Sequence, residues 1–176
     1  MLIIDWRPIT ETDEIPSFGE ELKRRLENRN YAVKNASCSV WNLLYETLLA
    51  NDLPIGDVTF TDTGKPCFLN SNFYFSISHS HGLCAVAVAD KPVGVDVEII
   101  KTTYPPHLVE RSLTDDEKAI YDGDFTRIWC RKEAVAKMTG EGITGYPVKI
   151  DTSTYTFHEQ QIERNGQKYW LVVVSD

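Results

Sequence analysis

One short segment, residues 93–98, limits what this chain can fold into more than any other. It reads Val-Gly-Val-Asp-Val-Glu, and it continues the apolar pattern of a buried strand. Because side chains alternate across a strand, Asp96 and Glu98 lie on one face and the valines on the other. A strand that is buried on its valine face therefore presents two carboxylates together on its opposite face. Taken alone, such a pair is also typical of a solvated strand surface.

A second segment, residues 129–137, predicts a helix with a charged stripe. Glu133 and Lys137 are four positions apart, so they lie on the same side of that helix. The pair could be an ordinary stabilising contact on a helix surface. If the helix instead packs near Asp96 and Glu98, three carboxylates and a lysine converge, which suits a divalent cation and a phosphate-bearing substrate.

Composition limits the partners and the number of domains. The chain has 176 residues and a net charge of −8, with a pI near 5.0. This size fits one domain, or two small halves packed as one unit. An acidic surface argues against nucleic acid as the main partner, because neutralising its phosphates requires a basic surface.

The cysteines and the N-terminus indicate a cytoplasmic protein. The four cysteines (Cys38, Cys67, Cys84 and Cys130) are scattered, with no zinc-ligand spacing, so we expect reduced thiols. The first residues acquire a charge at Asp5, too early for a signal peptide. No apolar run approaches the length of a membrane-spanning helix, so we expect no membrane partner.

The order of predicted elements indicates an α+β fold made of two similar α/β halves, about residues 1–91 and 92–176. Each half has a strand, a capped helix, a second helix and a β-rich run, a period of about 90 residues. We expect one domain with a ligand site at the seam between the halves. The predicted helices are 17–28, 35–50, a short one from 114, and 124–139, and the predicted strands are 2–5, 58–60, 73–78, 84–88, 93–98, 152–157, 162–164 and 169–174.

Two further motifs precede the strand at residues 93–98. Gly64-Lys65-Pro66 is a turn signal, and residues 75–80 read Phe-Ser-Ile-Ser-His-Ser. With the strand and helix motifs in this order, the chain resembles the 4′-phosphopantetheinyl transferase family. The two-half layout is similar to its monomeric branch, typified by the surfactin-synthetase activator, which implies a monomer.

The resemblance implies a reaction, a cofactor and partners. The family transfers the 4′-phosphopantetheine group of coenzyme A to a serine of an acyl or peptidyl carrier protein, and it requires Mg²⁺. It implies Asp96, Glu98 and Glu133 as metal ligands, and Glu133, Lys137 and Asp96 as catalytic residues. The implied coenzyme A contacts are Lys65, Pro66, Ser78, His79 and Lys137.

Several roles stay open at this stage. The family commonly has an arginine for the 3′-phosphate where Ala36 and Ser37 stand here, and Lys23, Arg24, Arg25 and Lys34 are candidates to replace it. Lys132 is interpreted as a solvent-side or structural lysine, and His81 as a surface residue. The rival functions are a catalytically degenerate module that only binds coenzyme A or a carrier protein, and an unrelated Mg²⁺-dependent phosphatase or nucleotidyl enzyme.

Overall fold

The structure is a computed structural model that describes residues 1–27, 30–141 and 150–176. Its helices are α1 (Glu20–Glu27), α2 (Tyr31–Ala50), α3 (Pro106–Ser112), α4 (Asp115–Ile120) and α5 (Phe125–Thr139). Its strands are β1 (Leu2–Pro8), β2 (Val58–Phe60), β3 (Pro66–Phe68), β4 (Tyr74–Ser80), β5 (Leu83–Ala89), β6 (Val93–Ile99), β7 (Phe157–Arg164) and β8 (Gln167–Ser175). In these ranges, no helix is both long enough and apolar enough to cross a membrane. The mixture of helices and strands confirms the predicted α+β class.

Within the described residues, the strands form three antiparallel sheets, ordered β1-β5-β4, β2-β3 and β6-β8-β7. The two three-stranded sheets share one plan. In each, the first strand pairs with the last strand of its half, and that last strand also pairs with the strand before it. This plan is what an internal duplication would produce, although the duplication itself stays a prediction.

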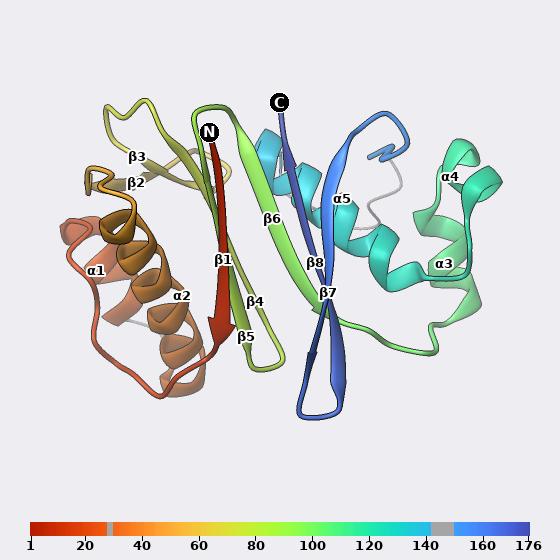
Figure 1. The fold of residues 1–176 in the computed structure, drawn as a ribbon, viewed down its shortest axis with the longest axis horizontal. Helices are drawn as coiled ribbons and strands as arrows, with labels where there is room; N and C mark the ends of the chain where they lie inside the picture. Colours follow the sequence, from red (N-terminus) through yellow and green to blue (C-terminus); the bar gives the residue numbers. More distant parts are fainter. Residues whose placement is uncertain (28–29, 142–149) are drawn as a thin grey trace.

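The middle strands β5 and β8 are apolar on both faces because both faces of their sheets are covered. Val86 and Val88 of β5 face a core shared with α1 and α2. Ala85 and Ala87 face a second core, which the two large sheets form between them with Val95 of β6. β8 alternates in the same way between this second core and a third core beneath α5. The layers are therefore helices, sheet, sheet and helix (Figure 1).

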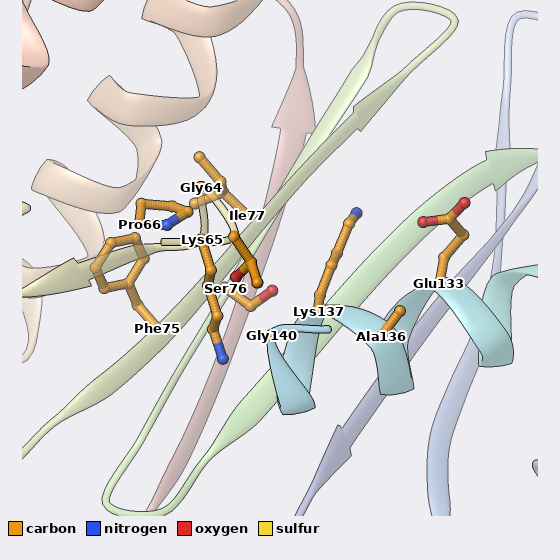
Figure 2. A pocket seen from close by; sticks show the side chains of 11 residues that line it. Gly64, Lys65, Pro66, Phe75, Ser76, Ile77, Glu133, Ala136, Lys137 and Gly140 are labelled. Atoms are coloured by element: carbon orange, nitrogen blue, oxygen red, sulfur yellow. The ribbon is translucent and has the colours of Figure 1, made fainter. Parts of the chain in front are cut away.

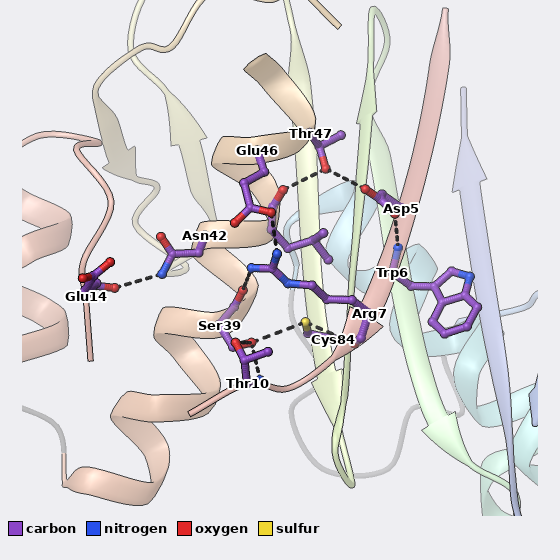
Figure 3. Close-up of polar contacts among 11 residues, drawn as sticks. Asp5, Trp6, Arg7, Thr10, Glu14, Ser39, Asn42, Glu46, Thr47 and Cys84 are labelled. Atoms are coloured by element: carbon purple, nitrogen blue, oxygen red, sulfur yellow. Dashed lines mark hydrogen bonds and ion pairs between the residues drawn. The ribbon is translucent and has the colours of Figure 1, made fainter. Parts of the chain in front are cut away.

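Polar contacts orient α2 against β1 (Figure 3). The hydroxyl of Thr47 donates to Asp5 Oδ2 at 3.2 Å, and the guanidinium of Arg7 pairs with Glu46. Surface ion pairs contribute only about 0–1 kcal/mol each to the free energy of unfolding. These contacts therefore set the orientation of α2 on β1 more than they stabilise the fold. The orientation matters because α2 carries Trp41, a buried side chain that lines the cavity described below.

Helix α5 packs directly onto strand β6 at Gly94. A Cβ atom at this position would lie 1.9 Å from Ala134 O and 2.7 Å from Met138 N, both backbone atoms of α5. Glycine is therefore required here for close backbone approach, not for an unusual turn. The approach brings Lys137 of α5 to Asp96 of β6.

Most predicted elements are present, with differences at their ends. α2 begins at Tyr31, not at position 35, because the side chain of Asn30 accepts a hydrogen bond from Val33 N and caps the helix. The first helix ends at Glu27, and position 28 of its predicted range lies outside the described residues. The predictions missed α3 and β3.

The predicted strand 152–157 is wrong except for its last residue, where β7 begins. The backbone N–H of Thr152 donates to Glu117 Oε1 at 3.0 Å, so its hydrogen bond goes to a side chain of α4 and not to a neighbouring strand. A side-chain acceptor from a distant helix has here replaced strand pairing.

Of the two interpretations of Lys132, solvent-side or structural, the structure supports the structural one, because the side chain is fully buried. Its Nζ lies 2.6 Å from Glu117 Oε2, and it also donates to the carbonyl of Ile150. Burial lowers the pKa of Lys132. Burial alone would raise the pKa of Glu117, but the hydrogen bonds from Lys132 and Thr152 outweigh it and lower that pKa. Lys132 is thus a structural residue that ties α5 to α4 and to the segment before β7.

Candidate active site

A row of serine hydroxyls joins β4 to β6 where the two halves meet. Ser76 Oγ accepts a hydrogen bond from Val95 N at 3.0 Å, and Ser78 Oγ accepts one from Val97 N at 3.3 Å. The two strands belong to different sheets, so side chains make the connection that a backbone ladder makes within each sheet. This join, the seam, places the polar face of β4 against the carboxylate face of β6.

Asp96 lies at the centre of the seam and is only 3% exposed. Its Oδ1 accepts hydrogen bonds from Ser78 Oγ at 2.8 Å and from Lys137 Nζ at 2.7 Å. Its Oδ2 is buried and has no hydrogen-bond partner among the described residues. Buried polar atoms are normally paired, and an unpaired carboxylate oxygen is a ready ligand for a hard cation.

Glu98 and Glu133 share this negative environment. Burial raises the pKa of Glu133 to about 7, and the nearby charges of Asp96 and Glu98 add to the effect. The pKa of Glu98 is also raised, first by burial and then by Asp96. Burial acts to lower the pKa of Lys137, but the charges of Asp96 and Glu133 outweigh it and raise that pKa. Three interacting carboxylates and one firmly protonated lysine therefore occupy the seam.

Two adjoining cavities open at the seam. The larger, the seam cavity, has a volume of about 440 Å³ and lies between α1 and α2 on one side and α5 on the other. It is bordered by seven of the predicted site residues: Pro66, Ser78, His79, Asp96, Glu98, Glu133 and Lys137. The smaller has a volume of about 250 Å³ and shares Glu133 and Lys137 with the first. Figure 2 shows these two side chains projecting from one side of α5, across from Gly64 and Pro66.

The donor set at the seam fits a magnesium ion. Mg²⁺ prefers oxygen ligands, usually a few carboxylates completed by water and substrate phosphate. The open Oδ2 of Asp96 and the mutually repelling Glu98 and Glu133 meet that preference. In the described part of the chain, no three His, Cys, Asp or Glu side chains are grouped closely enough to be a finished metal centre. The ammonium group of Lys137, 2.7 Å from Asp96 Oδ1, supplies a positive charge beside this carboxylate.

The predicted coenzyme A residues border the same two cavities. Ser78 and His79 line the seam cavity, Lys65 lines the smaller one, and Pro66 lines both. Lys65 Nζ donates to Met138 O at 2.7 Å, and burial lowers its pKa. The structure thus places all of these residues together, and their individual roles stay predictions.

Sequence reasoning missed several residues of this region. Of the candidates for the absent arginine, Arg25 borders the seam cavity, with its guanidinium 3.7 Å from the centre of the Phe60 ring. Ser76 and Ser80 were not singled out, although Ser76-x-Ser78-x-Ser80 puts all three hydroxyls on one face of β4. That alternation is the signal that could have identified the seam.

Comparison with known proteins shows which family the chain is similar to. The model of the 4′-phosphopantetheinyl transferase superfamily matches residues 92–172, which hold β6, α5 and the carboxylates. The 4′-phosphopantetheinyl transferase ffp of Bacillus subtilis is 27% identical over 169 residues, covering 87% of this chain and 74% of that protein. The transferase Sfp of Bacillus subtilis strain 168 is 25% identical, with the same coverage. The transferase psf-1 of Bacillus pumilus is 34% identical over 52% of this chain and 44% of its own length. Residues 92–172 therefore match the 4′-phosphopantetheinyl transferase superfamily, and most of the chain is similar to transferases of that family.

Proposed function

We propose that this protein transfers the 4′-phosphopantetheine group of coenzyme A to a serine of an acyl or peptidyl carrier protein in the cytoplasm. The observation that supports this most is the seam cavity, where Asp96, Glu98, Glu133 and Lys137 meet between two packed halves. We further propose one monomeric domain with pseudo-repeat halves at about residues 1–91 and 92–176. The magnesium ligands are Asp96, Glu98 and Glu133, as the donor chemistry favours.

The chemistry is a single displacement at phosphorus. The carrier serine oxygen bonds to the β-phosphorus of coenzyme A, the bond from that phosphorus to the bridging oxygen breaks, and 3′,5′-ADP leaves. Glu133 takes the serine proton, since a carboxylate positioned at the reacting hydroxyl can serve as a general base. Lys137 holds positive charge beside the reacting phosphates. Bound Mg²⁺ would neutralise the pyrophosphate.

The test is intact-mass spectrometry of an apo carrier protein after incubation with this protein, coenzyme A and Mg²⁺, with an EDTA control. We expect a gain equal to one phosphopantetheine group, and none with EDTA. Glu133→Gln should slow transfer by roughly 10²–10⁴-fold, the usual contribution of a general base. Glu110→Gln, a change at an exposed glutamate on α3, is the matched control and should transfer at the normal rate.

Other outcomes would redirect the assignment. Coenzyme A binding with no transfer to any of several carrier proteins would indicate the degenerate binding module. Hydrolysis of coenzyme A without a carrier would indicate the phosphatase or nucleotidyl alternative. Full transfer activity in Asp96→Ala or Glu133→Ala would show that the roles given to these carboxylates are wrong.

A further inference from the structure

A chain of hydrogen bonds runs from the protein surface to Glu98. His81 Nδ1 lies 2.8 Å from Ser80 Oγ, and Ser80 Oγ lies 2.9 Å from Glu98 Oε2. His81 is exposed, Ser80 is half-buried, and Glu98 lines the seam cavity. The proposed function uses Glu98 but gives no role to Ser80 or His81.

The chemistry of the three groups fixes which atom donates in each of these two hydrogen bonds. An ionised carboxylate only accepts hydrogen bonds, so Ser80 must use its single proton to donate to Glu98. Ser80 Oγ can then only accept from the imidazole, which fixes the tautomer of His81 with its proton on Nδ1. His81 therefore determines where the serine hydroxyl points, and the hydroxyl determines which oxygen of Glu98 is held.

The turn that carries His81 does not require an imidazole. His81 has φ 45° and Gly82 has φ 91°, so both central residues of the β4–β5 hairpin are left-handed, where Asn, Asp and Gly are preferred. The backbone of this turn is fixed independently of the ring, because the hydroxyl of Tyr169 donates to His81 O at 2.8 Å. Histidine thus stands where other residues would make the turn more easily, and its ring contacts Ser80.

We infer that His81 is a positioning residue: through Ser80 it holds the Glu98 carboxylate as a metal ligand. This inference rests on the proposed function, because it takes Glu98 to be a ligand of Mg²⁺. Hydrogen bonds to a ligating carboxylate restrict its orientation, and losing such a bond weakens metal binding without removing a ligand. His81 and Ser80 extend the site beyond Asp96, Glu98, Glu133 and Lys137.

Three variants distinguish the loss of the imidazole hydrogen-bond donor from a change in the backbone turn. His81→Gly keeps the left-handed turn and removes the donor, whereas His81→Asn keeps the turn and offers an amide N–H near the position of Nδ1. Ser80→Ala removes the hydroxyl that links the two. His158→Asn, at an exposed histidine on β7, is the matched control.

The probe is Mn²⁺, with binding measured by electron paramagnetic resonance in the presence of coenzyme A. We expect Ser80→Ala to bind Mn²⁺ about 10-fold more weakly, the lower end of the effect of removing an outer hydrogen bond. His81→Gly should show a loss of several-fold, and His81→Asn should restore most of it. The double variant Ser80→Ala/His81→Gly should match Ser80→Ala alone, because the imidazole acts through the serine. His158→Asn should bind as the unmodified protein does.

Other results would contradict either this inference alone or the inference together with the proposed magnesium site. Unchanged Mn²⁺ affinity in His81→Gly overturns this inference and leaves the proposed function standing. An equal loss in His81→Gly and His81→Asn also overturns it, since the donor would then not be what matters. Absence of Mn²⁺ binding to the unmodified protein overturns the proposed magnesium site and this inference together. Thermal unfolding of every variant shows whether the fold is kept.

Discussion

Replacing Gly94 with alanine is the sharpest test of how this site is assembled. The added Cβ would lie 1.9 Å from Ala134 O and 2.7 Å from Met138 N. These two atoms are four residues apart on α5, so they form one of its helical hydrogen bonds. Neither atom is the flexible end of a side chain, and the clash can be relieved only by moving the helix or the strand.

The size of the movement follows from the contact distance. Ordinary van der Waals contact begins near 3.4 Å, so α5 must move away from β6 by about 1.5 Å at this point. Overpacking a well-packed core costs about 1–3 kcal/mol and sometimes more. Because the added Cβ clashes with two backbone atoms, we expect the free energy of unfolding to fall by about 3 kcal/mol. For a domain of this size that is a fall in Tm of roughly 6–12 °C. A displacement of about 1 Å at a reacting group costs about 10²-fold in rate, so transfer should fall by at least that factor.

Thermal unfolding and the carrier mass shift measure both effects on one preparation. Gly56→Ala is the matched control, because a Cβ there would meet Phe68 at 3.7 Å, an ordinary contact. We expect the control to keep its activity and its Tm. A Gly94→Ala protein with a normal Tm and a normal transfer rate would refute the claim that close approach of α5 to β6 builds the site.

Further predictions concern single groups of the site and the seam. Glu133 has a pKa of about 7 in the folded protein and an ordinary value of 4.5, so the unfolded chain loses its proton first as the pH rises. The free energy of unfolding therefore falls between these two pH values and stays reduced above pH 7. Glu133→Gln should therefore be more stable than the unmodified protein at pH 8 without Mg²⁺, by about 1–3 kcal/mol in urea unfolding, and equal to it below pH 4.5; a constant difference at all pH values would contradict this. Lys132→Met leaves Glu117 buried without its cation and should cost about 3–5 kcal/mol, whereas Lys132→Met combined with Glu117→Leu should recover much of the loss; an additive double variant would show that the pair is not coupled. The pKa of Glu117 is lowered on folding, so its stabilising contribution is present above pH 4.5 and is lost as the pH falls through its folded pKa; Glu117→Gln should flatten that part of the stability curve. Ser76→Ala leaves the buried N–H of Val95 without an acceptor and should lower the free energy of unfolding by about 1–3 kcal/mol, with no change in cofactor requirement.

The parts of the site that sequence could predict are those that depend on local periodicity. Asp96 and Glu98 share a face because a strand alternates, and Glu133 and Lys137 share a side because a helix repeats, so these pairs were recognisable without a structure. The bonding of Asp96 to Lys137 was not, because it depends on how closely α5 packs on β6.

Burial of charged groups was the main source of error. The sequence around Lys132 shows a lysine on a helix, and such residues are usually solvated. Its burial depends on Glu117, which lies on another helix and supplies the compensating charge. The false strand at residues 152–157 has the same origin, since Thr152 also binds Glu117. One buried carboxylate thus explains the wrong strand and decides between the two interpretations of Lys132.

The serine row has a consequence for how such proteins diverge. Ser78 bonds to Val97 N of β6 and to Asp96, whereas Ser76 bonds to Val95 N of β6 and lines the smaller cavity. Among the described residues, Glu133 makes no hydrogen bond that joins these two strands. In a lineage that abandoned catalysis, selection would therefore release the acidic positions first and retain the serines longest. A descendant could have serines at the positions of Ser76 and Ser78 but neutral residues in place of Glu133 and Glu98. Such a protein would have kept the fold and lost the carboxylates of the site.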